Sequence, residues 1–167
     1  MSLERLWAGW RTAYVEGVAT APVPADGQAC LFERLLAADA TEALVLARSD
    51  DAFAVMNAYP YTSGHLMVAP VRHAATLAEL SRAEAAAIMA MVQDATMAVQ
   101  AAYSPDGINV GANIGRAAGA GIPGHFHVHV LPRWTGDTNF MTTVAEARVL
   151  PEALDRGYEK LLATWPA

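Results

Sequence analysis

The sequence predicts an α+β fold: an antiparallel sheet of about five strands, with one long helix packed on one face and a second helix near the C-terminus. Three observations support this: short apolar runs bounded by turn residues, a capped amphipathic helix, and a late segment in which polar and apolar residues alternate. The 167 residues suit a single domain. We expect it to span 1–167, as an N-terminal arm and loop (1–28), a core (29–140) and a C-terminal segment (141–167).

Three strands are expected in the first part of the core. The runs Ala43–Ala47 and Phe53–Asn57 flank a Ser-Asp-Asp turn and therefore predict an antiparallel pair. A third candidate, His65–Ala69, follows a Thr-Ser-Gly turn. It ends at Pro70, which has no N–H to donate to a neighbouring strand.

The most strongly indicated element is a helix from about Ser81 to Ala102. Ser81 and Glu84 have the spacing of a capping box, in which each side chain accepts a hydrogen bond from the other residue's backbone amide. Apolar residues then recur at helical spacing and predict one buried face. Three further elements are expected after this helix: strands over Ile108–Ala112 and His125–Leu131, and a helix over Glu152–Thr164.

Composition and charge exclude several classes of protein. Hydrophobic residues make up 54% of the chain and charged residues 17%, which favours a folded globular chain. The net charge of −6 provides no general attraction to nucleic acid or to anionic membranes, so we expect neither as a partner. The single cysteine excludes an intrachain disulfide, and the N-terminus lacks the pattern of a signal peptide. Together these features predict a cytoplasmic protein.

Three histidines alternate with apolar residues in the last predicted strand. Because successive side chains of a strand point to opposite faces, His125, His127 and His129 would share one face. Imidazole titrates near neutral pH, so one ring can be a neutral nucleophile while its neighbours contact a phosphate. The alternative for any single one of them is an ordinary half-buried histidine. The preceding glycine-rich segment, 107–124, would let backbone amides approach an anion, with Gly121 among the candidate contacts.

The alternating run His125–Leu131 resembles the signature of the histidine triad (HIT) family. The segment Val55–Pro70 is similar to that family's first strand pair, which surrounds the nucleoside pocket. Within the family, the aromatic arm around Trp7, the turn Tyr59–Tyr61 and the segment Pro132–Phe140 resemble the actinobacterial diadenosine tetraphosphate phosphorylases. The resemblance implies a HIT-like fold, a homodimer, and an enzyme acting on nucleotides such as diadenosine tetraphosphate or AMP-like and ADP-like molecules.

The resemblance also implies a role for each site residue. His127 would attack the α-phosphorus and form a covalent nucleotidyl-histidine, with a backbone carbonyl fixing its tautomer and with His125 and His129 completing the catalytic group. His129 would also contact the phosphate. Asn57 would bind the ribose and Asn113 the phosphate or leaving group, unless these amides only cap turns. No cofactor is required for this chemistry, and the acceptor, water or inorganic phosphate, stays open.

A structural zinc site is a further implication of the resemblance. Bacterial relatives hold zinc through a Cys-x-x-Cys pair, a later histidine and the first histidine of the triad. Here Cys30 and Glu33 occupy the place of the pair, and His73 matches the later histidine. Cys30, Glu33, His73 and His125 would then offer four donors of types that zinc accepts. The alternative is a buried thiol, an exposed glutamate and a surface histidine with no metal.

Two other functions remain open from the sequence. In a metal-dependent hydrolase, the three alternating histidines would bind a catalytic ion directly, and activity would be lost in EDTA. In a nucleotide-binding protein without appreciable turnover, AMP would bind tightly and no product would form.

Overall fold

The structure is a computed structural model that describes residues 30–137 and 152–166. The predicted N-terminal arm and the linker before the C-terminal helix lie outside these residues. The elements in chain order are α2 (Leu31–Ala37), β1 (Val45–Arg48), β2 (Ala52–Met56), β3 (Leu66–Pro70), the short 3-10 helix η1 (Leu77–Glu79), α3 (Arg82–Tyr103), β4 (Gly107–Gly111), a second 3-10 helix η2 (Arg116–Ala118), β5 (Val128–Arg133) and α5 (Leu154–Ala163).

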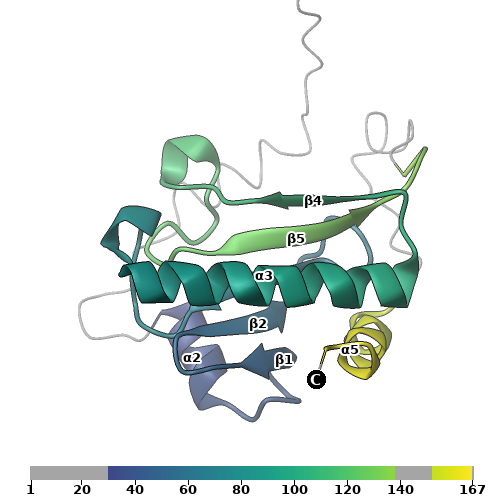
Figure 1. The fold of residues 1–167 in the computed structure, drawn as a ribbon, viewed down its shortest axis with the longest axis horizontal. Helices are drawn as coiled ribbons and strands as arrows, with labels where there is room; N and C mark the ends of the chain where they lie inside the picture. The colour runs from purple at the N-terminus through teal and green to yellow at the C-terminus, as the bar shows by residue number, and fades with distance from the viewer. Residues whose placement is uncertain (1–29, 138–151, 167) are drawn as a thin grey trace, which may run out of the picture.

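The five strands form one antiparallel sheet in the order β1-β2-β3-β5-β4, which confirms the predicted fold class (Figure 1). The last strand along the chain therefore lies between β3 and β4. His129 of β5 faces Met67 of β3 on one side and Gly111 of β4 on the other. β4 is an edge strand with mostly exposed residues, and the expected homodimer stays a prediction.

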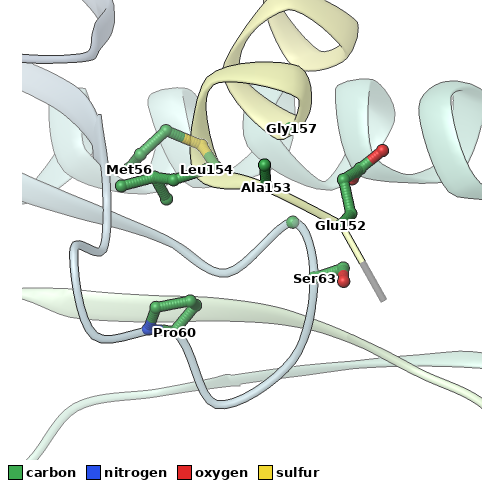
Figure 2. A pocket seen from close by; sticks show the side chains of 8 residues that line it. Met56, Pro60, Ser63, Glu152, Ala153, Leu154 and Gly157 are labelled. Carbon is green, nitrogen blue, oxygen red and sulfur yellow. The ribbon is translucent and has the colours of Figure 1, made fainter. Parts of the chain in front are cut away.

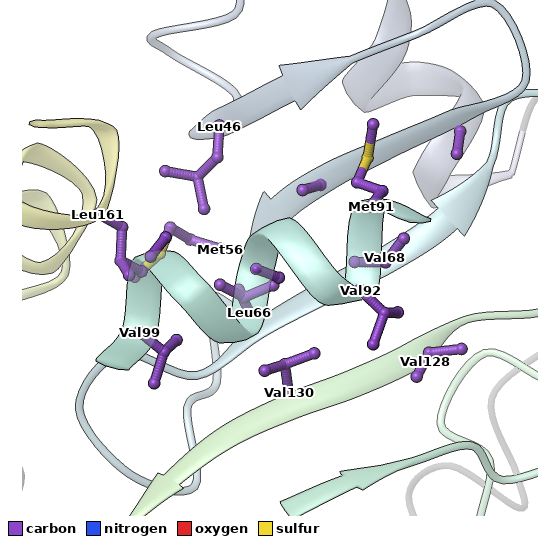
Figure 3. Close-up of a cluster of buried hydrophobic side chains, with 14 of the residues drawn as sticks. Leu46, Met56, Leu66, Val68, Met91, Val92, Val99, Val128, Val130 and Leu161 are labelled. Carbon is purple, nitrogen blue, oxygen red and sulfur yellow. The ribbon is translucent and has the colours of Figure 1, made fainter. Parts of the chain in front are cut away.

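Helix α3 covers one face of the sheet, and its bounds agree with the predicted helix to within one residue (Figure 1). The Ser81–Glu84 capping box is present, with the Ser81 hydroxyl accepting from the Glu84 amide at 3.1 Å. By length and composition α3 could cross a membrane. Its buried stripe instead packs on the sheet and on α5, as in the core helix of a compact domain (Figure 3). The labelled core residues are Leu46, Met56, Leu66, Val68, Met91, Val92, Val99, Val128, Val130 and Leu161.

The opposite face of β2 and β3 carries a second, smaller core. Phe53 and Met67 from these strands pack with Cys30 and Phe32 of the α2 region. Helix α2 was not predicted, although its start carries a local signal: the Glu33 carboxylate accepts a hydrogen bond from the Cys30 backbone amide at 2.6 Å. That pattern marks the first turn of a helix, so Glu33 has a structural role here besides its predicted role as a metal ligand.

The starts of β5 and of the C-terminal helix lie later than predicted. β5 begins at Val128 and not at His125, because the Phe126 amide donates to the Ala74 carbonyl at 2.7 Å and so leaves the β3 ladder. The segment before Val128 is extended but is bonded to the loop after β3. The C-terminal helix begins at Leu154, two residues later than predicted, and its N-cap is Ala153.

Gly64, in the turn before β3, provides a test of the packing. It has φ of +77°, and a Cβ added there would lie 2.6 Å from Cε2 of Tyr103. Gly64→Ala should therefore lower the free energy of unfolding by about 2 to 4 kcal/mol through backbone strain and overpacking. Gly107→Ala is the matched control, because no atom lies within 4 Å of its added Cβ. Urea unfolding measures both variants, and equal stabilities would contradict the packing.

Candidate active site

The ring of His127 is held in one tautomer by its own chain. Its Nδ1 lies 2.8 Å from the carbonyl oxygen of His125, which can only accept a hydrogen bond. Nδ1 therefore carries the proton, and Nε2 keeps a free lone pair. The ring is buried and packs against Phe32 of α2, with ring centroids 5.2 Å apart. Burial lowers the pKa of His127, so the neutral ring is favoured at neutral pH.

His65 also belongs to the site, although it was not among the predicted site residues. The Tyr61 backbone amide donates to Nδ1 of His65 at 3.1 Å, so the ring proton of neutral His65 lies on Nε2. That nitrogen is 2.9 Å from Nδ1 of His129 and donates to it. The neutral His129 ring consequently carries its proton on Nε2. No sequence pattern indicates this contact, because the two histidines are 64 positions apart.

The electrostatics of His129 favour the same neutral form. Burial, reinforced by the nearby His127, lowers the pKa of His129 to about 4. At neutral pH, His127 thus presents a lone pair and His129 an N–H donor, on rings whose centroids are 4.9 Å apart. Tyr61 also stacks on His129, at 5.8 Å between centroids. The pair combines a nucleophilic nitrogen with a hydrogen-bond donor, which suits attack at a phosphorus atom.

The other residues predicted to contact the nucleotide are Asn57, Asn113 and Gly121. Asn57 lies at the end of β2, where its Oδ1 accepts from the Tyr59 amide at 2.9 Å and its Nδ2 lies 3.3 Å from Nδ1 of His65. Its side chain therefore shapes the turn that carries His65, and its contact with the ribose stays a prediction. Asn113 and Gly121 are partly buried in the segment between β4 and β5.

Cys30, His73 and His125 bring their ligand atoms together. One such atom from each residue lies within 4.8 Å of the others, and Sγ of Cys30 is 3.2 Å from Nδ1 of His125. The other ring nitrogen of His125 donates to the Pro70 carbonyl at 2.9 Å and leaves Nδ1 facing the group. Burial raises the pKa of the Cys30 thiol.

The structure places Glu33 at the border of this group. One oxygen of its carboxylate caps α2, and the other is 3.6 Å from Nδ1 of His73. Within 30–137 and 152–166, the group of residues whose ligand atoms converge consists of Cys30, His73 and His125. Neither His127 nor His129 belongs to it. This arrangement does not favour the alternative in which the three alternating histidines share one catalytic ion.

Comparison with known proteins assigns a family to this geometry. The HIT domain model matches residues 39–136, which is more than half of the chain. The chain belongs to the HIT domain family. It is 41% identical to a Mycobacterium tuberculosis (strain H37Rv) protein named AP-4-A phosphorylase, over 97% of this chain and 84% of that protein.

Solved structures of HIT proteins share the fold. A Zn-bound histidine triad family protein from Mycobacterium smegmatis has a TM-score of 0.66 and 26% identity, over 81% of this chain and 92% of that chain. A hypothetical histidine triad nucleotide-binding protein from Sulfolobus tokodaii has a TM-score of 0.63 and 26% identity, over 81% of this chain and 88% of that chain. The predicted family and the predicted HIT-like fold are both confirmed.

The lowered pKa of His129 predicts how stability depends on pH. An unfolded histidine titrates near 6.5, whereas folded His129 titrates at about 4. As pH falls between these values, the unfolded chain binds a proton that the folded chain does not bind, so the free energy of unfolding decreases. His129→Gln should lose less stability than wild type between neutral pH and about pH 5 in urea unfolding. Equal losses would contradict the lowered pKa.

Proposed function

We propose that this HIT protein cleaves dinucleoside polyphosphates, such as diadenosine tetraphosphate, at the α-phosphate through a nucleotidyl-His127 intermediate. The observation that carries the mechanism is the 2.8 Å hydrogen bond from Nδ1 of His127 to its own chain, which leaves Nε2 free to attack. The substrate class is supported by the relative named AP-4-A phosphorylase, whose similarity extends over 97% of this chain.

In the first step, Nε2 of His127 forms a bond to the α-phosphorus of diadenosine tetraphosphate. The bond from that phosphorus to the bridging oxygen breaks, and ATP leaves with the electron pair. The Nε2–H of His129 donates a hydrogen bond to the phosphoryl group and so stabilises charge as the geometry changes. The bond of Nδ1 to the His125 carbonyl also stabilises the positive charge that develops on the His127 ring.

In the second step, an acceptor attacks the adenylyl-histidine and the nitrogen–phosphorus bond breaks. Inorganic phosphate as acceptor yields ADP, and water yields AMP. The name of the Mycobacterium tuberculosis relative supports phosphate. We therefore propose a phosphorylase that converts diadenosine tetraphosphate and phosphate to ATP and ADP.

Product analysis tests this proposal. Wild type incubated with diadenosine tetraphosphate should form equal amounts of ADP and ATP only when phosphate is added, as measured by chromatography of the nucleotides. His127→Ala should lose at least ~10³-fold in rate, because the nucleophile is absent. AMP formed without phosphate would identify a hydrolase using the same nucleophile. Full activity in the variant would refute the mechanism, and tight AMP binding without product would indicate a binding protein.

We also propose that Cys30, His73 and His125 hold a structural zinc ion. Thiolate and imidazole are donors that zinc prefers, and their ligand atoms already converge within 4.8 Å. The hydrogen bond from His125 to the Pro70 carbonyl orients the ring, as the partners of metal-bound histidines commonly do. The ion would tie the start of α2 to the segments that follow β3 and precede β5.

Zinc content measured on protein purified without chelator tests this proposal. We expect about one ion per chain, in line with a structural site, and loss of the ion in Cys30→Ala. Glu33→Gln should keep most of the zinc, because the Glu33 carboxylate already caps α2. His127→Ala is the control that should retain it fully. Substoichiometric zinc that Cys30→Ala does not change would refute the site, and loss in Glu33→Gln would make Glu33 a ligand.

A further inference from the structure

The turn that precedes His65 rests on an aromatic ring from the far end of α3. Tyr103 is the last residue of that helix, and its ring lies so close to Gly64 that an added Cβ would be 2.6 Å from Cε2. The His65 amide donates to the Thr62 carbonyl at 3.2 Å and closes the turn. The position of the Tyr103 ring therefore limits where the backbone next to His65 can lie.

The C-terminal segment holds Tyr103 in place. The phenol donates to Oε2 of Glu152 at 2.7 Å, and the other oxygen of Glu152 forms an ion pair with Lys160 of α5. Nζ of Lys160 also lies 5.3 Å from the centroid of the Tyr103 ring. Burial, together with the hydrogen bond to Glu152, raises the pKa of Tyr103, so the phenol keeps its proton and remains the donor.

A small cavity lies between the turn and the beginning of α5. Its volume is about 10 Å³, roughly the space of one water molecule. Figure 2 shows the turn on one side and the beginning of α5 on the other. The lining residues are Met56 of β2, Pro60, Ser63 and Gly64 of the turn, and Glu152, Ala153, Leu154 and Gly157 of the C-terminal segment. The Tyr103 ring, by contrast, lies directly against the turn at Gly64.

We propose that Tyr103 and Glu152 are positioning residues for the active site. By supporting the Gly64 turn, they fix the ring of His65, and through His65 they determine which nitrogen of His129 carries the proton. Glu152 and α5 lie outside residues 39–136, the part matched by the HIT domain model. The consequence for catalysis rests on the proposed function, whereas the tautomer of His129 can be observed without any substrate.

Nitrogen NMR of ring-labelled protein, combined with phosphorolysis kinetics, tests the proposal. Wild-type His129 should show a protonated Nε2 and an unprotonated Nδ1. Tyr103→Leu removes the ring beneath Gly64, so both tautomers of His129 should appear and kcat should fall on the order of 10-fold with little change in KM. Tyr103→Phe keeps the ring and loses only the bond to Glu152, so its values should lie between these.

Glu159→Gln is the matched control, because Glu159 is an exposed residue of α5 whose carboxylate forms an ion pair with the exposed Arg156. It should leave both the His129 signals and kcat unchanged. A folded Tyr103→Leu with wild-type His129 signals and wild-type kcat would overturn the proposal. If Tyr103→Leu does not fold, Glu152→Ala decides, because it removes the acceptor of the Tyr103 phenol: a His129 spectrum and kcat identical to wild type would overturn the proposal equally. If wild type lacks phosphorolysis, the proposed function fails and the His129 signals still decide this inference.

Discussion

β3 and β5 run antiparallel, with Met67 opposite His129 and Val68 opposite Val128, and this pairing places the histidines of the site. At the beginning of β3, His65 comes to lie beside His129 and donates to it. At the end of β3, the Pro70 carbonyl accepts from His125. A slip of one residue would turn the histidine face toward α3 and break both contacts. The register of these two strands is therefore the constraint on which the site depends.

The site would bind an anionic ligand through local hydrogen-bond donors, because the net charge of the chain does not attract anions. The chain carries a net charge of −6, and burial keeps both His127 and His129 neutral at neutral pH. A polyphosphate would then be met by N–H groups of fixed direction. Fixed dipoles need no reorganisation as charge develops, which is the favourable condition for stabilising a transition state. If His129 carried its proton on Nδ1 instead of Nε2, the site would lose the Nε2–H donor. His65 would at the same time lose the lone pair to which it donates.

A series of hydrogen bonds therefore connects the rest of the fold to the candidate active site. The Tyr61 amide sets the tautomer of His65, and His65 sets that of His129. The turn carrying Tyr61 and His65 lies against Tyr103, which α5 holds through Glu152. The C-terminal helix thus contributes to the arrangement of the site although it contains none of the triad. The smaller core around Phe32 supports the other side, where the rings of His125 and His127 pack.

The sequence by itself determined the features that depend on neighbours in the chain. The capping box at Ser81 and the helical spacing after it predict α3, and alternation predicts that His125, His127 and His129 share a face, because both effects operate within a few residues. Only the tertiary structure decided which segments meet. In the folded chain the Phe126 amide donates to the Ala74 carbonyl, so β5 begins later than predicted. The Glu33 carboxylate caps α2. The tertiary structure also brought His65 to His129, since contacts between distant residues follow from strand register and packing and leave no periodic signal in the chain.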